Sequence, residues 1–360
     1  MADDVIKDFN EQAAEEAEVR RKQRLLTRRR TELDFKRLEE SDEQAERSKT
    51  ISFAAPSPED IARYQRDNEE YMAAAREGKV FINQDFSGVV PFFRKNLILV
   101  GAVSGEGKTT CAANLTKSAI LQGMRGIVFT NEERSEDFYN RVTSLLKKWP
   151  YTNHNSIPPE RVPVYTEFIA RLAPRLTVVD DSYGGTSGTT TTLEGMTGAL
   201  DQLLREYRET EESYGFVVLE YYQNVSRSRD NNRMEPWQVM EQLARRLDEF
   251  KNAYPAPVVV MAQLMPGDKD GKTPFKHRVE GRKSILNPAT CALEVRADRK
   301  MRRTEWVIHK SRYTEAMGQS FFTGYDRGEY VRYTPEFAMA AEQRALMRGV
   351  FKGKDGGDAK

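Results

Sequence analysis

The stretch from Asn96 to Gly123 contains residues whose types and order suit the binding of nucleotide phosphates. It reads NLILVGAVSGEGKTTCAANLTKSAILQG: an apolar run, a glycine-bearing turn, and a Thr- and Ala-rich segment of helical length. In a strand–loop–helix unit of this kind, the loop N–H groups and the positive end of the helix dipole face an anion. Lys108 would then reach the β- and γ-phosphates, and the Thr109 hydroxyl would bind Mg²⁺. The predicted phosphate-binding residues are Ser104, Gly105, Glu106, Gly107, Lys108, Thr109 and Thr110.

One position departs from the strict P-loop pattern, which has glycine six residues before the lysine. Ala102 stands there, while Gly101, Gly105 and Gly107 still supply conformational freedom to the loop. The alternative is a glycine-rich turn that happens to contain Gly-Lys-Thr. The apolar run before the loop and the helical segment after it favour the P-loop.

Polar residues at the ends of strand-like runs could complete a site for hydrolysing the bound nucleotide. Phosphoryl transfer to water needs a carboxylate that polarises the water, which suits Glu132, and another that holds Mg²⁺ through its waters, which suits Glu220. Gln263 would sense the γ-phosphate. Each acid alone could be an exposed strand-end residue, but their joint position after a P-loop favours a site. Asp180 and Asp181 stay ambiguous, because a helix N-cap or a loop anchor explains them equally well.

Strand-like and helix-like segments alternate through the middle of the chain and would position these residues. This alternation predicts an α/β fold with a mainly parallel central sheet flanked by helices, whose ligands bind at the carboxyl ends of the strands. The predicted strands are 97–100, 126–130, 176–181, 216–220 and 257–262, followed by hairpin-like runs at 305–310, 319–325 and 330–333. The predicted helices begin near 58, 108, 135, 191 (from the capping box Thr191-x-x-Glu194) and 237.

The sequence predicts four parts along the chain. They are a charged helical or disordered arm at 1–50, a linker and subunit-docking helix at 51–78, the α/β core at 79–335, and a short helix with a flexible tail at 336–360. In the arm, the basic clusters at 20–22 and 28–30 could contact phosphate backbones, but interleaved acids favour a charge-mixed tail.

Composition excludes several classes of protein. Among 360 residues, 39% are hydrophobic and 31% charged, and the net charge of +1 gives no global attraction to nucleic acid, so any such binding must use local patches. Two cysteines and three histidines supply neither a disulfide framework nor a zinc signature. No apolar run is long enough to span a bilayer, and the acidic N-terminus lacks a signal peptide. We therefore expect a cytoplasmic or nucleoplasmic protein without a membrane partner.

The order of motifs resembles one known family. The runs GAVSGEGKTT, FTNEERSEDFYNRV, VVDD, FVVLEYYQN and VVVMAQL, in this order, are similar to the RecA-like P-loop ATPase motor domain of DnaB-type hexameric replicative helicases. The resemblance extends over roughly 57–335 and includes the late strand 306–312. In that family the lysine and arginine that close this strand reach the γ-phosphate of the neighbouring subunit, and here they are Lys310 and Arg312.

Three departures from the family accompany the resemblance. Glu220 stands where the family usually has Asp, which alters the reach toward Mg²⁺ by one methylene. The acids common around 284–289 are mostly replaced, here by Asn287 and Pro288. The charged arm stands in place of the N-terminal primase-binding domain, so coupling to a primase is in doubt.

The two polar loops that follow Glu220 and Gln263 are expected to line a central channel. Their cations could track the phosphates of a single strand without reading its sequence. The alternative is a pair of solvated surface loops. The predicted nucleic-acid contacts are Arg227, Arg229, Arg233, Lys269, Lys272, Lys276 and Arg278.

The resemblance implies a motor that hydrolyses ATP with Mg²⁺, translocates on single-stranded DNA and unwinds duplex. Its implied partners are other copies of itself in a homohexamer ring and other replication proteins, in the cytoplasm of a bacterial or viral replication context. Two alternatives stay open. One is a RecA-, RadA- or KaiC-like DNA-dependent ATPase that mediates recombination, and the other is a nucleotide-gated scaffold without unwinding.

Overall fold

The computed structural model describes most of the chain after residue 80. The described residues are 57–59, 61–62, 65–66, 69, 81–90, 92–150, 157–181, 188–220, 222–226, 234–267, 273–279, 283–312 and 314–352. The predicted arm at 1–50, most of the predicted helix after residue 58 and the tail after 352 lie outside them. The chain divides into two units, Met1–Glu70 and Tyr71–Lys360, and each is described by itself. In the first unit, the Ile61 N–H donates to Ser57 O at 3.0 Å, the bonding of a first helical turn.

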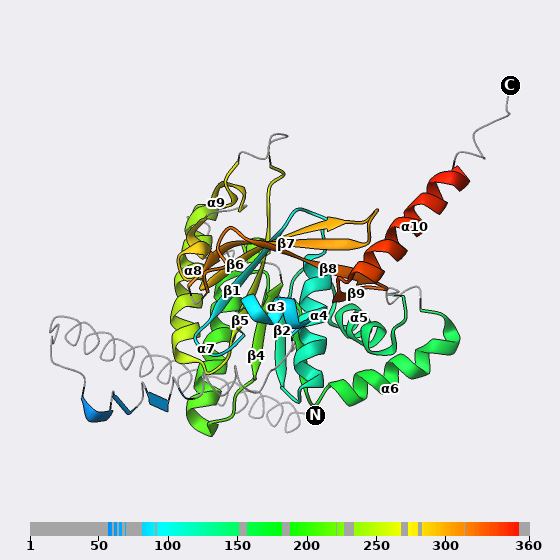
Figure 1. The fold of residues 1–360 in the computed structure, drawn as a ribbon. Helices are drawn as coiled ribbons and strands as arrows, with labels where there is room; N and C mark the ends of the chain where they lie inside the picture. Colours follow the sequence, from blue (N-terminus) through cyan, green and yellow to red (C-terminus); the bar gives the residue numbers. More distant parts are fainter. Residues whose placement is uncertain are drawn as a thin grey trace, which may run out of the picture. The chain divides into compact units, whose positions relative to one another are not determined.

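One sheet runs through the second unit, and nine strands of the described residues belong to it, in the order β3-β2-β4-β5-β1-β6-β7-β8-β9 (Figure 1). From β3 to β6 neighbouring strands are parallel, and from β6 to β9 they form an antiparallel meander. The predicted α/β fold with a mainly parallel sheet is confirmed. The strands are β1 Leu97–Ala102, β2 Gly126–Thr130, β3 Leu176–Val179, β4 Phe216–Glu220, β5 Val258–Gln263, β6 Cys291–Asp298, β7 Arg303–Ser311, β8 Ser320–Asp326 and β9 Glu329–Arg332.

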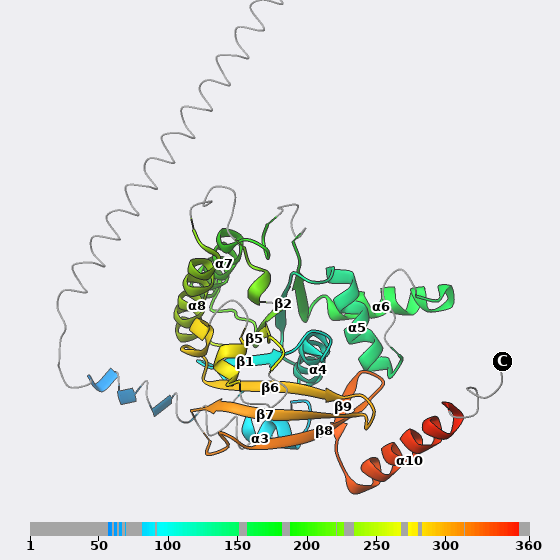
Figure 2. The ribbon, with the colours of Figure 1, turned by 90° about the horizontal axis from the view of Figure 1, so that it is seen from above.

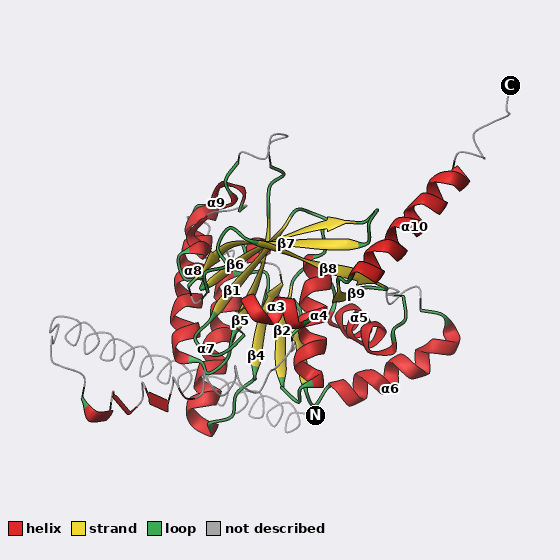
Figure 3. Ribbon diagram, in the orientation of Figure 1, coloured by secondary structure: helices red, strands yellow, loops and turns green. Residues whose placement is uncertain are grey.

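Helices cover both faces of the parallel strands, with α7 and α8 on one face and α4, α5 and α6 on the other (Figures 2 and 3). The helices are α3 Gln84–Val89, α4 Lys108–Leu121, α5 Ser135–Lys147, α6 Val162–Leu172, α7 Leu193–Thr210, α8 Pro236–Ala253, α9 Phe275–Arg278 and α10 Pro335–Lys352. Single 3₁₀ turns lie at η2 Pro159–Arg161, η4 Tyr222–Asn224 and η5 Lys283–Leu286. Among the described residues, no helix combines the length and apolar character that crossing a membrane requires.

The alternation of side chains along β1 explains the two layers of the core. Successive strand residues point to opposite faces. Leu97 and Leu99 therefore pack in one buried cluster with α7 and α8, and Ile98 and Val100 pack in the other with α4 and α5. Both clusters consist of fully apolar runs, as expected for parallel strands that are covered on both sides.

Parallel register brings the predicted site residues to the same edge of the sheet. Ala102, the last residue of β1, pairs with Gln263 at the end of β5, and Thr130 at the end of β2 pairs with Glu220 at the end of β4. The loops that follow these strands therefore emerge side by side.

Thr192, and not Thr191 as predicted, caps α7. The Thr192 hydroxyl accepts from Gly195 N–H at 3.1 Å. Thr191 is unavailable for this role because its hydroxyl donates to Asp181 at 2.7 Å. The sequence did not predict α3 or α6, and α10 continues to Lys352.

Candidate active site

The loop between β1 and α4 has the geometry of a phosphate-binding turn. Gly105 and Gly107 have φ values of +81° and +101°, a region that glycine enters without steric cost. The Glu106 N–H donates to Val103 O at 3.0 Å and closes the turn, and Gly107 O accepts the first helical bond from Cys111 at 2.8 Å. The predicted residues Ser104 to Thr110 thus form one continuous loop and helix start.

The side chain of Lys108 lies at the base of this loop, where it is only 6% exposed. Its Nζ donates to Gln263 Oε1 at 3.5 Å. Gln223 fixes the main chain of Gln263, because its Oε1 accepts Gln263 N–H at 3.1 Å and its Nε2 donates to Gln263 O at 3.0 Å. The structure therefore brings together the P-loop lysine and the predicted γ-phosphate sensor.

Glu220 lies buried beside Thr109. It is 1% exposed, and neither carboxylate oxygen has a partner with good hydrogen-bond geometry among the described residues. Burial, with the nearby charge of Glu133, raises the pKa of Glu220 to about 8, although the adjacent Thr109 hydroxyl lowers that pKa. Two unpartnered carboxylate oxygens next to a hydroxyl are the hard oxygen donors that Mg²⁺ prefers. The predicted metal residues Thr109 and Glu220 therefore fit a magnesium ion.

The turn between β2 and α5 brings two more carboxylates close to Glu220. Glu132 is exposed, whereas Glu133 is partly buried and forms a two-point ion pair with Arg141, at 2.7 Å and 3.3 Å. Both acids raise the pKa of Glu220. The Asn131 N–H donates to Glu220 O at 2.9 Å and joins the turn to the end of β4. Glu132 thus stands at the edge of the site, on a turn anchored by its neighbours.

Asp180 and Asp181 have structural roles. Asp180 accepts from Ser135 N–H at 2.9 Å, at the N-terminus of α5. Asp181 accepts from Gly188 N–H at 2.8 Å and from the Thr191 hydroxyl. Their ambiguity in the sequence is resolved in favour of a helix cap and a loop anchor.

Lys310 and Arg312 lie toward the other end of the sheet from the P-loop of their own chain. The P-loop carboxylate of Glu106 accepts Ala297 N–H at 2.5 Å, whereas Lys310 pairs with Ala292 in the β6–β7 register. The five residues of strand from Ala292 to Ala297 span about 16 Å. The structure therefore does not bring these two cations to the other site residues of the same chain.

The segment after η5 holds both cations. Lys310 Nζ donates to Leu286 O at 2.5 Å and to Asn287 O at 3.3 Å, and Arg312 donates to Asn287 O at 3.0 Å. Burial, together with the charges of Arg312 and Lys251, lowers the pKa of Lys310. Arg312 is exposed and borders a cavity of about 450 Å³. Its other walls are Glu241, Ala244, Arg245, Asp248, Lys251, Asn252, Ser284, Asn287 and Pro288.

Of the seven cations predicted to contact nucleic acid, the structure describes Lys276 and Arg278. Lys276 is exposed on α9. Arg278 is 8% exposed, and its guanidinium donates to Glu294 Oε1 at 2.6 Å and to Met265 O at 3.0 Å. Arg278 is therefore corrected from a phosphate contact to an internal tether. The others, Arg227, Arg229, Arg233, Lys269 and Lys272, lie outside the described residues.

A cavity of about 620 Å³ adjoins the outer side of the P-loop. Arg299 donates to Gly105 O at 2.6 Å and Tyr330 to Gly107 O at 3.5 Å, so both side chains touch the loop. Guanidinium groups and tyrosine rings suit a planar base and a ribose. The lining residues are Gly105, Glu106, Gly107, Thr110, Ala297, Asp298, Arg299, Arg302, Arg303, Thr304, Tyr325, Arg327 and Tyr330.

Comparison with known families decides the affiliation of this chain. The profile of the DnaB-like helicase C terminal domain matches residues 82–316, well over half of the sequence. The chain belongs to this family. The resemblance inferred from its motifs is confirmed. A search of curated proteins finds no match.

Two solved structures share the fold. One is the ATPase domain of a DnaB-like replicative helicase, which is 13% identical with a TM-score of 0.58, covering 76% of this chain and 99% of that one. "The Structure Of A DnaB-Like Replicative Helicase And Its Interactions With Primase" is 13% identical with a TM-score of 0.57, covering 71% of this chain and 63% of that one. At this identity the likeness establishes the fold, which is the RecA-like helicase core.

Membership of the DnaB-like family makes this chain a helicase domain that hydrolyses nucleoside triphosphates. Several residues near its site escaped prediction. Glu133 and Arg141 are eight positions apart on a turn and a helix, so only folding brings them together. Arg299 and Tyr330 lie in the late hairpins, where no spacing signal indicates contact with the P-loop. Gln223 was visible in the run FVVLEYYQN, but without an assigned role.

Proposed function

We propose that this DnaB-like domain is an ATP-driven ring motor that translocates on single-stranded DNA and unwinds duplex. The observation that carries the proposal is the grouping at one sheet edge of Lys108 against Gln263 and Thr109 against the buried Glu220. A phosphate cradle, a γ-phosphate contact and a cation site are the parts that phosphoryl transfer to water requires.

Each residue of the site has a distinct part in this chemistry. Lys108 and the loop N–H groups bind the phosphates, and the cavity beside Arg299 and Tyr330 takes the nucleoside. Thr109 and Glu220 hold Mg²⁺, which supplies positive charge to the phosphate oxygens. Glu132 orients and polarises the attacking water. The raised pKa of Glu220 favours a protonated side chain until a cation arrives, so cation binding displaces its proton.

The position of Lys310 and Arg312 supports a ring of identical subunits. They lie away from their own P-loop, on an exposed face beside the 450 Å³ cavity. In a homohexamer they would complete the site of the adjacent copy and stabilise the charge that develops on its γ-phosphate. The predicted docking helix after residue 58 belongs to the same proposal.

Single-stranded DNA is the proposed track. Lys276, together with Arg227, Arg229, Arg233, Lys269 and Lys272, would contact its phosphates without reading bases. Other replication proteins are proposed partners of the ring.

The decisive experiment combines imaging with an unwinding assay. Electron microscopy with an ATP analogue and an oligonucleotide should show six-membered rings, and a forked duplex with a free 5′ tail should be unwound when ATP and Mg²⁺ are present. Filaments without unwinding would favour a RecA- or RadA-like mediator. Hydrolysis that ignores single-stranded DNA at every salt concentration would favour a KaiC-like, nucleotide-gated scaffold.

A further inference from the structure

We propose that Arg278 and Glu294 are positioning residues that clamp the base of the loop after β5, and thereby link Gln263 to that loop and to β7. This inference rests on the proposed function, because the loop is the expected DNA contact. The two residues with Met265 are called the loop-base clamp below.

The loop after β5 is closed at its base by main-chain and side-chain bonds. Met265 N–H donates to Arg278 O at 2.7 Å, and Arg278 Nε donates back to Met265 O at 3.0 Å. A bridge between Leu264 and Val279 lies directly beside them. Met265 follows Gln263 by two residues, so a displacement of Gln263 by a γ-phosphate reaches the clamp through a very short piece of chain.

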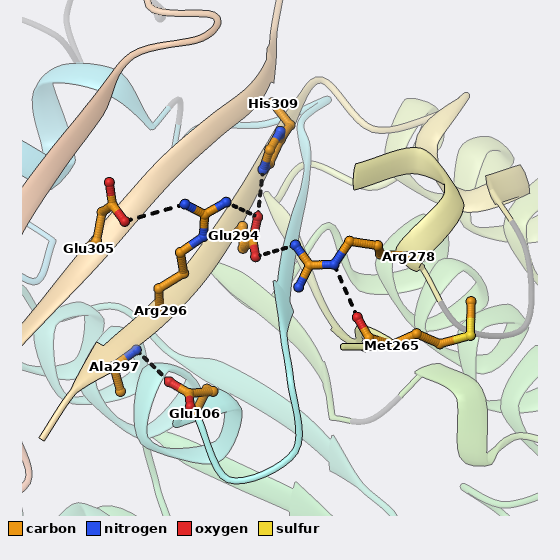
Figure 4. Close-up of polar contacts among 8 residues, drawn as sticks. All are labelled: Glu106, Met265, Arg278, Glu294, Arg296, Ala297, Glu305 and His309. Atoms are coloured by element: carbon orange, nitrogen blue, oxygen red, sulfur yellow. Dashed lines mark hydrogen bonds and ion pairs between the residues drawn. The ribbon is translucent and has the colours of Figure 1, made fainter. Parts of the chain in front are cut away.

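Glu294 anchors this base to the sheet. It lies on β6, its side chain is 2% exposed, and it accepts from Arg278 at 2.6 Å, Arg296 at 3.0 Å and His309 at 2.9 Å (Figure 4). Burial opposes ionisation, but the hydrogen bonds from His309, Arg296 and Arg278 together hold the pKa of Glu294 at about 2. A buried carboxylate with several charged donors is costly to disturb, so it fixes the geometry around it.

The same carboxylate also reaches the strand that carries Lys310. His309, which binds Glu294, is the preceding residue of β7, and its ring stacks on Phe275 of α9 with centroids 4.2 Å apart. The loop base, β6 and β7 thus meet at Glu294. The far end of β6 contacts the P-loop through Ala297 and Glu106 (Figure 4).

Arg278 and Arg296 provide a matched pair for testing the clamp. Both guanidiniums bind Glu294, but Arg278 also holds Met265 O, whereas Arg296 binds Glu305 on β7 at 3.4 Å. A lysine in place of Arg278 keeps a positive charge beside Glu294 and loses the two-directional fork. R278K and R296K therefore make the same chemical change, with and without loss of the clamp.

The first measurement is hydrogen exchange of the Met265 amide in the full chain without DNA. Losing a charge-assisted bond at the loop base should speed exchange about tenfold or more in R278K, while R296K stays close to wild type. Equal exchange in all three proteins would overturn the clamp. Equal acceleration in R278K and R296K would overturn it as well, because a general loosening around Glu294 would then explain the effect.

The second measurement is the ratio of DNA-stimulated to basal ATP hydrolysis, with oligo-dT as the probe. R278K and E294Q should lower this ratio about tenfold, the scale of one charge-assisted hydrogen bond, and R296K should leave it near the wild-type value. A wild-type ratio of one defeats the proposed function, whereas normal stimulation in R278K defeats only the coupling.

A double variant separates coupling from stability. R278M leaves Glu294 short of a partner and should lower the thermal midpoint, whereas R278M/E294L removes both charges and should recover much of that loss. The stimulation ratio should stay low in the double variant. Recovery of stimulation together with stability would show that the pair acts only structurally and would overturn the proposal.

Discussion

At the residue scale, burial determines how Lys108 and Glu220 can act. Lys108 is held at the base of the loop against Gln263, so its charge is aimed at bound phosphate and not at bulk water. Glu220 is deprived of protein hydrogen-bond partners by the same burial, which prepares its oxygens for a cation. Lysine and glutamate at the surface would do neither.

Lys108→Ala should abolish nucleotide hydrolysis, because the β- and γ-phosphates lose their only buried positive partner among the described loop residues. We expect at least a hundredfold loss, on the scale of a removed transition-state contact of about 3 kcal/mol. Steady-state phosphate release measures it. Lys147→Ala on α5 is the matched control and should retain wild-type turnover. Full activity of Lys108→Ala would contradict the P-loop assignment.

Glu294 predicts a loss of stability in acid. Its pKa lies near 2 in the folded protein, below the ordinary value of 4.5, so its stabilisation is complete above pH 4.5 and is lost as pH falls toward 2. About 2 kcal/mol of unfolding free energy should disappear between pH 6 and pH 3. Urea titrations should show the difference between wild type and Glu294→Gln shrinking by that amount. A difference independent of pH would contradict the assignment.

At the element scale, the β8–β9 hairpin is tied to the P-loop helix through one buried amide. Asn114 on α4 donates to Gly328 O at 2.8 Å and accepts from Tyr330 N–H at 3.1 Å. Tyr330 in turn reaches Gly107 O. An element from the end of the chain thereby forms one wall of the nucleotide cavity.

Asn114→Ala should leave main-chain groups of this hairpin unsatisfied and cost about 2 kcal/mol of stability. Because the cavity wall loosens, the Kd for nucleotide should rise several-fold while hydrolysis at saturation falls less. Chemical denaturation and titration with a fluorescent nucleotide measure the two effects. Gln202→Ala, a surface amide on α7, is the control. Unchanged nucleotide affinity would show that the hairpin does not shape the site.

At the scale of the whole molecule, the sheet separates the two halves of a hydrolysis site. The P-loop stands at one end of β6 and Lys310 and Arg312 stand toward the other. A subunit with this arrangement would offer a nucleotide on one face and cations on another. Such head-to-tail complementarity closes into a ring when the rotation between copies is right.

Arg312→Ala should therefore keep nucleotide binding but lose at least a hundredfold in turnover, because the neighbouring γ-phosphate loses a charged donor. Mixing it with Lys108→Ala should restore part of the activity, since some interfaces then combine an intact P-loop with an intact Arg312. Arg171→Ala on α6 should behave as wild type. Absence of rescue in the mixture would contradict a site shared between subunits.

The sequence by itself determined the order of elements and the P-loop, because apolar runs, glycine spacing and the Lys-Thr pair are local properties of the chain. It also placed Glu132, Glu220 and Gln263 at strand ends, and parallel strands bring such ends to one edge. Only the tertiary structure decided that Arg278 is buried against Glu294, that Tyr330 borders the P-loop, and that Arg312 stands far from its own site. These facts depend on contacts between residues distant in sequence, which packing fixes and local patterns do not encode.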